Sequence, residues 1–461
     1  MSVEPSEVVV PSGHGGHSGL SIPKAAFFIV GEIAGSGVLA LPKAVEDTGW
    51  IGLVIITACS FLSAYTGHIL GKSWIIASHR FKDCRGHVPD PYPLIGEKAY
   101  GKWGRQLVNF SINFTLFGVG TVFLLLASEN VESLFKDVGW DLSFCVWCII
   151  LAVILTPVTW LGTPQDFWQV AVGATIATTI ACVILITNIG LESEDLDGKP
   201  VVHQEIKFLD FFTAFGTIVF AFGGHPAFPT FQNDMKKQKD FKWAVFFGYL
   251  IVLLMYFPVS TAGYFVYGKV LDDNILNSVC QSASRTHCRK GMTVAIQILI
   301  TLHLMFGFVI VLNPFCQQVE SGLFKVDSTK FTFKRVLVRS GLVAIVLFIA
   351  ETIPHFGAIL SLVGGSTTTL LAYVCPSVFY LKLCRMPYDE ELIEPDEGNV
   401  NVRPVKLPGT EPDGTIIIPF WEKVLNYEII AIGLIAGVAS TVSAVIGIVQ
   451  PDTFTVPCYA R

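Results

Sequence analysis

The sequence predicts an all-α membrane protein of eleven transmembrane helices. Two five-helix repeats are expected to be inverted relative to each other, with helices one and six broken. Three observations lead to this fold class: a very apolar composition, recurrent apolar runs of about 20 residues, and one glycine-and-proline break that occurs twice. Each is taken in turn below.

The composition argues for a membrane protein. Hydrophobic residues make up 52% of the 461 residues and charged residues only 15%, whereas soluble domains average about 25% charged residues. An apolar helix of about 20 residues spans roughly 30 Å of hydrocarbon, and such runs recur along the whole chain. The alternating ten-residue strands of a transmembrane β-barrel are absent from the pattern.

The apolar runs define eleven expected spans. Their ranges are 23–48, 50–76, 107–128, 143–161, 168–190, 209–232, 242–267, 291–322, 335–353, 356–382 and 426–449.

These spans divide the chain into regions. Residues 1–21 are polar and expected to form a disordered cytosolic tail. Residues 22–450 form the transmembrane domain, in which repeat one covers 22–190, repeat two covers 209–382 and the extra helix covers 426–449. The loop 383–425 is expected to be cytosolic, and 451–461 to be an external tail.

The distribution of basic residues predicts the orientation. Most of the 31 Lys and Arg residues fall in, or border, the segments that face the cytosol if the N-terminus is cytosolic. Because basic residues concentrate on the cytosolic side, we expect the N-terminus inside and the C-terminus outside.

The 11 cysteines give a separate expectation. Cys280 and Cys288 lie in one polar loop on the predicted outer side, where disulfides persist, so we expect them to be bonded to each other. Cys145 and Cys148 form a CxxC pattern within a span and are interpreted as packing residues.

The break in the first span is repeated in the sixth. GEIAGSGVLALP, residues 31–42, places glycines, a serine and a glutamate at mid-depth, and FAFGGHPAFP, residues 220–229, is its counterpart. In both, a proline follows the last glycine by five positions. Shifting the chain by the same offset superimposes spans three and five on spans eight and ten. Because five is odd, the second copy must cross in the opposite sense, and such inverted repeats with broken first helices point to a midplane binding site.

A broken helix exposes main-chain groups that must find polar partners in a membrane. The helix that restarts near Gly37 offers N–H groups to a carboxylate, and the half-helix that ends near Ala34 offers carbonyls to an ammonium. The sequence therefore predicts a site for a small zwitterion. Its expected contacts come from both breaks: Ala34, Gly35, Ser36, Gly37, Phe222, Gly223 and Gly224.

Four stretches resemble the amino acid/auxin permease family, whose members share a transmembrane amino acid transporter domain within the amino acid–polyamine–cation superfamily. They are GSGVLALP in the first span, YPLIGEKAYGKWGR at 92–105, FAFGGHPAFPTFQNDM at 220–235 and HLMFGFVIVLNP at 303–314.

The resemblance implies a leucine-transporter-like fold with substrate between broken spans one and six. It also implies secondary active transport of small amino acids across a plasma, endolysosomal or vesicle membrane, often driven by protons. An amino acid sensor of the same fold, or a sodium-coupled carrier, is the alternative.

Three residues are candidates for ion coupling. Glu32 lies one turn before Gly35, and a carboxylate at bilayer depth suggests function; a protonated glutamate that caps backbone groups is the alternative. His225 lies beside the second break and His303 lies in mid-span eight, where an imidazole can carry a proton. A hydrogen-bonded core histidine is the alternative for His225. Span eight lacks an adjacent pair of hydroxyl residues, so a proton is favoured over sodium.

The sequence gives no reason to expect an enzyme. It contains no Walker motif, HExxH or paired zinc CxxC, so no cofactor or metal is expected. The expected partners are an amino acid, protons and membrane lipid, and no nucleic acid.

Overall fold

A computed structural model describes residues 19–86, 88–136, 139–160, 168–196, 200–280, 289–322, 324–325, 331–387, 410–411, 413–449 and 457–460. Most of these residues are helical, and their only β structure is two isolated bridges, Leu20 with Met235 and Thr410 with Ile416. The α-helices and π-helices are α1 (Ile22–Ile33), α2 (Gly37–Thr48), α3 (Ile51–Arg80), α4 (Pro91–Lys136), α5 (Phe144–Thr159), α6 (Trp168–Ser193), α7 (Phe208–Ala221), α8 (Phe228–Asn233), α9 (Phe241–Tyr267), α10 (Ile275–Ser278), α11 (Lys290–Gly322), α12 (Phe333–Thr352), α13 (Phe356–Val363), the π-helical η6 (Gly364–Thr368) and η7 (Leu370–Val374), α14 (Cys375–Arg385) and α15 (Phe420–Val449).

Each predicted span range contains a helix or a broken pair of helices. By length and apolarity, the described residues hold eight candidate spans, or nine when the bent pair α1–α2 counts as one. The helix α5 is short, at 16 residues, and α12 carries charged residues near both ends, including Lys334, Arg335 and Glu351. The protein is therefore a multi-pass helical membrane protein, and the count of eleven spans stays a prediction.

The helix that contains the predicted third span is longer than that span. The third span was expected from residue 107, but α4 begins at Pro91 and turns at Tyr100 and Gly101. Gly101 has a φ of 66°, a left-handed conformation that glycine adopts without steric cost. The segment before the turn is largely buried and carries Glu97 and Lys98, and these charges ended the apolar run that defined the predicted span.

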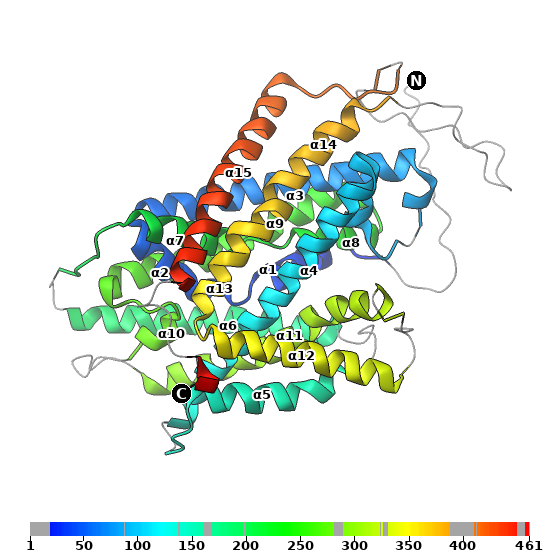
Figure 1. Cartoon of the computed structure of the whole chain (residues 1–461). Coiled ribbons are helices and arrows are strands. Elements are labelled where there is room, and N and C mark those ends of the chain that lie inside the picture. Colours follow the sequence, from blue (N-terminus) through cyan, green and yellow to red (C-terminus); the bar gives the residue numbers. More distant parts are fainter. Residues whose placement is uncertain are drawn as a thin grey trace.

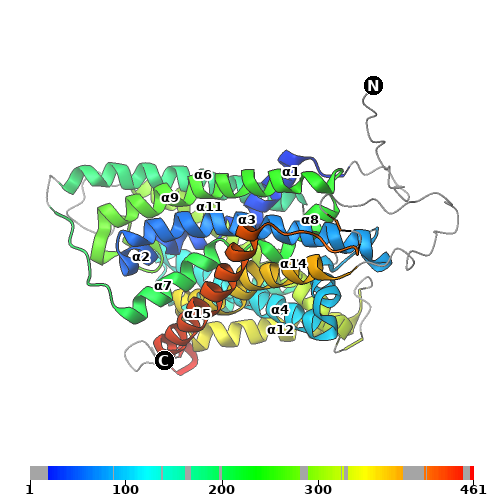
Figure 2. The same cartoon turned by 90° about the horizontal axis from the view of Figure 1, so that it is seen from above.

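The helices pack as two groups. In the first, α9 contacts α1, α2 and α3, and α7 contacts α2 and α3. In the second, α4, α5, α11 and α12 all contact one another. Figure 1 shows α3 and α9 along one side of the molecule and α5 and α12 along the other. Figures 1 and 2 both show α15 tilted across the other helices. The helix α6 bridges the groups through α9 and α11, and α13 does so through α4 and α7.

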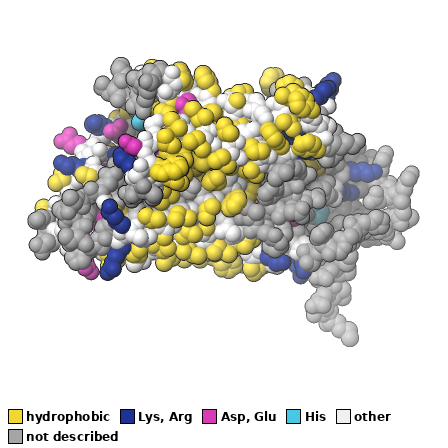
Figure 3. Space-filling view, turned by 90° about the horizontal axis from the view of Figure 1, so that it is seen from below, with side chains coloured by type: hydrophobic (Ala, Val, Ile, Leu, Met, Phe, Trp, Pro, Cys, Tyr) yellow, Lys and Arg dark blue, Asp and Glu magenta, His cyan; other side chains and the backbone are white. Residues whose placement is uncertain are grey.

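The outer surface suits a lipid environment. Large apolar side chains such as Phe61, Phe110, Val153 and Leu254 are exposed along the helices. In the view of Figure 3 the apolar side chains form a wide band, with lysine and arginine gathered at its two ends. This is the distribution expected when hydrocarbon covers the middle of a bundle and water covers its ends.

A buried ionic cluster holds the second group together. Arg339 of α12 donates from Nε to Glu320 Oε1 at 2.6 Å and from Nη2 to Oε2 at 3.2 Å. Its Nη1 donates to Thr159 O and to Asn313 Oδ1. Both charged side chains are at most 1% exposed. The cluster joins the ends of α5, α11 and α12.

The interpretation of Cys145 as a packing residue was wrong. Cys145 lies in the first turn of α5, where the C-terminal segment reaches it, and it forms a disulfide with Cys458 across 313 positions of sequence. Cys148, three residues further along, is buried and free, as expected. Cys280 is also disulfide-bonded, whereas its predicted partner Cys288 lies outside the described residues, so their pairing stays a prediction.

The Cys145–Cys458 bond gives a first testable prediction. Protease digestion without reduction should release a linked pair of peptides that contain Cys145 and Cys458, and mass spectrometry should detect it. Cys145→Ser should abolish this pair and lower the melting temperature, because a native disulfide typically contributes about 2–4 kcal/mol. Cys148→Ser is the matched control and should keep the linked pair. Free thiols at both positions in the native protein would contradict the structure.

Candidate functional site

The first break lies where predicted. The helix α1 ends at Ile33, α2 begins at Gly37, and the two axes bend by 61°. Ala34 and Ser36, between them, are buried. The Oγ atom of Ser36 has no hydrogen-bond partner among the described residues, which is unusual for a buried polar group.

The second break follows α7. Phe222, Gly223 and Gly224 leave the helix, a 3₁₀ turn covers His225–Ala227, and α8 begins at Phe228. Pro226 sits in the 3₁₀ turn, where its missing N–H does no harm. Both predicted interruptions are therefore present.

One helix supports both breaks. Tyr256 Oη of α9 donates to Ile33 O at 2.7 Å, and Tyr249 Oη donates to Phe222 O at 2.9 Å. Seven residues are about two helical turns, so the two tyrosines lie on the same face of α9. The carbonyls at the breaks were expected to accept hydrogen bonds from the ammonium group of a substrate. Tyrosine hydroxyls already bind two of them. Ile33 O keeps a second lone pair, whereas Phe222 O also accepts from Gly224 N–H at 3.2 Å.

The two breaks pack against each other at very short distances. A Cβ atom added to Gly37 would lie 2.7 Å from Ala221 Cβ, and one added to Gly224 would lie 2.7 Å from Ile33 Cγ1. Both distances are below those that real Cβ atoms show. Glycine is therefore required at these positions because each break lies against the other.

The tyrosine contacts give a second prediction. Tyr256→Phe removes the donor to Ile33 O and leaves a buried carbonyl short of a partner, which costs about 1–3 kcal/mol. Tyr249→Phe should have a smaller effect, because Phe222 O also accepts from Gly224 N–H at 3.2 Å. Thermal unfolding of the purified variants should show lower midpoints for both. Tyr264→Phe, on the same helix and with no hydroxyl hydrogen bond to a described residue, should unfold like the wild type; an equal loss in all three variants would contradict a specific role at the breaks.

His303 of α11 faces the first break. Its Nδ1 lies 3.0 Å from Thr178 Oγ1 and 3.2 Å from Ala174 O. A carbonyl only accepts, so Nδ1 carries the proton and the Nε2 of a neutral ring is the basic nitrogen. A Cβ atom on Gly35 would lie 3.4 Å from that Nε2. The basic nitrogen thus adjoins the unwound segment.

His225 is held in a similar way at the second break. Its Nε2 lies 3.0 Å from Thr66 Oγ1, whose own hydrogen goes to Leu62 O. Nε2 therefore donates, and Nδ1 keeps a lone pair. The side chain is fully buried and Nδ1 has no partner among the described residues.

Glu32 is exposed and has no hydrogen bond or ion pair with a described residue. It does not cap backbone groups of the described residues, which was the alternative to a coupling role. Phe28, one turn earlier on the same face, stacks on Phe231 of α8 with ring centroids 5.8 Å apart. The carboxylate therefore lies on the side of α1 that faces α8.

Sequence reasoning missed a polar segment in the predicted tenth span. Residues 364–368 and 370–374 are π-helical, a geometry that often marks functional sites. Tyr92 Oη donates to Leu371 O at 2.6 Å, and Thr367 Oγ1 lies 2.7 Å from Thr115 Oγ1. The run GGSTTT at 364–369, with three consecutive threonines at mid-span, was the signal that could have indicated it.

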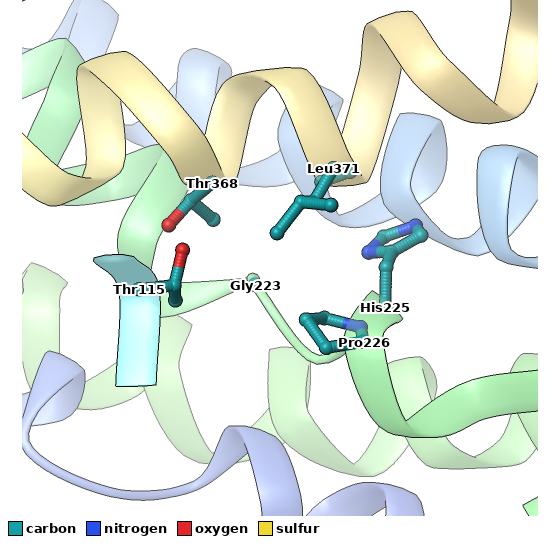
Figure 4. Close-up of a pocket in the computed structure, with 7 residues that line it drawn as sticks. Thr115, Gly223, His225, Pro226, Thr368 and Leu371 are labelled. Carbon is teal, nitrogen blue, oxygen red and sulfur yellow. The ribbon is translucent and has the colours of Figure 1, made fainter. Parts of the chain in front are cut away.

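A narrow gap lies between this segment, α4 and the second break. In this conformation the gap has no room for a water molecule. Figure 4 shows Thr115 and Thr368 on one side and the His225 ring on the other. The residues that line it are Thr115, Gly223, His225, Pro226, Thr368, Leu371 and Ala372.

Comparison with known families identifies the chain. The family model described as "Transmembrane amino acid transporter protein" matches residues 18–390. The chain belongs to this family. The predicted resemblance is therefore confirmed, and so is the prediction that the chain is not an enzyme.

Similar relatives of this family member come from Arabidopsis thaliana. Amino acid transporter AVT1B is 24% identical over 393 residues, which cover 82% of this chain and 68% of the relative. Amino acid transporter AVT1H is 27% identical over 365 residues, which cover 77% of this chain and 80% of the relative.

Among solved structures, this transporter-family chain is similar to an Eremococcus coleocola manganese transporter. The TM-score is 0.55 at 12% identity, covering 97% of this chain and 91% of the other. At this identity the likeness concerns the fold alone.

Proposed function

We propose that the protein is a secondary active transporter that moves small amino acids across a membrane by alternating access, driven by a proton gradient. The observation that carries the proposal is the crossing of two broken helices, Gly37 against Ala221 and Gly224 against Ile33. We further propose that the eleven predicted spans form the 5+5 inverted repeat, with the N-terminus in the cytosol. The relatives' printed names, amino acid transporters, support the substrate class.

The groups at the first break suit the two ends of an amino acid. The start of α2 supplies N–H groups and a positive dipole end for a carboxylate, and the unpartnered Ser36 Oγ lies just before it. The second lone pair of Ile33 O and the lone pair of His303 Nε2 are acceptors suited to an ammonium group. The substrate contacts we propose are Ala34, Gly35, Ser36, Gly37, Phe222, Gly223 and Gly224.

We propose His303 as the residue that couples substrate binding to protons. Thr178 and Ala174 fix its tautomer, so that the nitrogen next to Gly35 is the one able to take up a proton. Protonation would place a positive charge where the substrate ammonium is expected, so the two should compete for the site. Glu32, which is exposed on the α8 side, is the proposed route of proton exchange with the water phase.

Alternating access needs two bodies that move relative to each other. The two packed groups of helices supply them. At one end they are joined, because Asn274 Nδ2 in the loop after α9 lies 3.3 Å from both Glu129 Oε2 and Asn130 Oδ1 of α4. We propose that this conformation is closed at the Asn274 end and open on the Glu32 side.

Proteoliposomes test the function. With an imposed pH gradient, wild-type protein should accumulate a labelled small amino acid, and a protonophore should collapse the accumulation. His303→Gln should abolish gradient-driven accumulation but keep exchange between labelled and unlabelled substrate, because exchange needs no net proton movement. His79→Gln, a histidine at the end of α3 far from both breaks in sequence, is the control and should accumulate like the wild type.

Other outcomes would contradict the proposal in distinct ways. Accumulation that needs a sodium gradient would replace the proton with sodium. Binding without accumulation would indicate a sensor. An unchanged pH dependence in His303→Gln would remove this residue from coupling.

A further inference from the structure

One end of the bundle carries a group of basic and tyrosine side chains from three helices. Lys382 and Arg385 lie in the last turn of α14, three positions apart and therefore on one face. Lys423 and Tyr427 lie one turn apart on α15, and Tyr100 lies at the turn within α4. Figure 1 shows the end of α14 and the start of α15 at the same end of the molecule. These five residues form the basic patch.

A ring contact and a hydrogen bond hold the patch together. Lys382 Nζ lies 5.8 Å from the centre of the Tyr100 ring, which is a cation–π geometry. Arg385 Nη2 donates to Tyr427 Oη at 2.6 Å. The Arg385 guanidinium also lies close enough to the Tyr100 hydroxyl to act on it electrostatically. The two cations of α14 are therefore held between α4 and α15.

The end of α14 does not use these cations as caps. Basic residues in the last turn of a helix often bind its free carbonyls. Here Arg80 of α3 binds them, because its Nη1 donates to Leu383 O at 2.5 Å and to Met386 O at 3.1 Å. Among the described residues, Lys382 and Arg385 donate to no carbonyl. Helix capping therefore does not account for their charges.

The basic patch carries an excess of positive charge. Other basic side chains at this end of the bundle have acidic partners: Lys72 with Glu422 at 3.0 Å, Lys98 with Asp83 at 2.6 Å and Arg105 with Glu97 at 2.5 Å. Lys382, Arg385 and Lys423 form no ion pair within the part of the chain that the structure describes. The acid next to the patch in α15 is the exposed Glu428, so three positive charges there face one negative charge.

The patch lies at the depth of the lipid headgroups. It sits where one candidate span, Phe356–Arg385, ends and another, Phe420–Val449, begins. Trp103 and Trp421 lie near it in sequence and are 81% and 63% exposed, and exposed tryptophan is typical of the membrane–water interface. The anion that a bilayer offers at this depth is the phosphate of a phospholipid.

We propose that the basic patch binds an anionic phospholipid, whose phosphate lies among its three cations. The acyl chains lie along α15, where Leu434 and Val438 are exposed, seven and eleven positions after Tyr427 and on the same face. Each cation beside an anionic headgroup raises the affinity about fivefold. The bound lipid joins α4, α14 and α15 from outside the bundle. Its binding does not depend on which solute the protein transports.

A lipid titration tests this site. Full-length protein, delipidated in an uncharged detergent, is titrated with phosphatidylglycerol or with phosphatidylcholine of the same acyl chains. The lipid concentration that gives half of the maximal rise in the unfolding midpoint should be at least tenfold lower for phosphatidylglycerol. In the double variant Lys382→Gln, Arg385→Gln, the two concentrations should agree within about threefold. The double variant Lys98→Gln, Arg105→Gln is the matched control: it loses the same charge from cations that already have acidic partners, and should keep the wild-type ratio.

Four results would overturn the proposal. Equal concentrations for the two lipids in the wild type would do so even if the double variant does not fold. An unchanged ratio in a folded Lys382→Gln, Arg385→Gln protein would place the lipid elsewhere. Glycerophosphoglycerol, the headgroup without acyl chains, should give no shift, and a shift equal to that of the lipid would indicate a site for free phosphate esters. Discrimination that appears only after the acidic residues of 389–397 are made neutral would indicate that this segment occupies the patch.

Discussion

Replacing Gly37 by alanine is expected to lower the initial rate of amino acid uptake about 10–100-fold. The new Cβ would lie 2.7 Å from Ala221 Cβ and 2.8 Å from Ala221 Cα, so α2 or α7 must shift. Overpacking of this kind costs about 1–3 kcal/mol, which corresponds to the expected change in rate. Alanine is a better helix former than glycine by about 1 kcal/mol, so a weakened α2 cannot explain the loss.

Gly341→Ala, on the exposed side of α12, is the control. A Cβ atom there would meet no atom within 4 Å, and Gly341 is not among the proposed substrate contacts. Uptake should fall less than fivefold. Both rates must be normalised to the amount of reconstituted protein. If both alanine variants lose activity equally, the close approach of the two breaks is not what the substrate site requires.

Glu320→Gln is expected to destabilise the protein by about 3–5 kcal/mol, the usual consequence of removing one partner of a buried ion pair. Glu320 is fully buried and accepts two hydrogen bonds from Arg339, and its Oε1 lies 3.8 Å from Arg335 Nε. Neutralising it leaves two buried guanidinium groups to repel each other. Thermal unfolding in detergent should show a large fall in the midpoint.

Arg335→Gln is the comparison. At 3.8 Å its Nε interacts with Glu320 more weakly than Arg339 does, and its loss leaves the Glu320–Arg339 pair intact. The fall in the midpoint should be clearly smaller than in Glu320→Gln. A Glu320→Gln protein that unfolds like the wild type would mean that the cluster does not hold α11 and α12 together.

The local features of the fold could be predicted from the sequence. Helix ranges follow from apolar runs, and the breaks follow from glycines that a lipid-facing helix would not need. For the first span the prediction of 23–48 is met by Ile22–Thr48 with an interruption at residues 34–36. Both features depend on residues that are close together in the sequence, so the residue pattern alone indicates them.

The tertiary partners of the site could not be predicted. Tyr249 and Tyr256 look like ordinary aromatic residues of an apolar helix until the carbonyls of Phe222 and Ile33 are placed against them. Thr368 lies in a π-helical segment that no periodicity specifies. The Cys145–Cys458 bond joins residues 313 positions apart. Each depends on how distant helices pack.

The most direct test of a midplane site is a cryo-electron microscopy structure of the full-length protein with serine present. The carboxylate should lie at the start of α2, beside Ser36 and Gly37, with the amino group toward Ile33 O and His303 Nε2. Density for serine elsewhere in the bundle, with the space between the two breaks filled by protein side chains, would contradict the account.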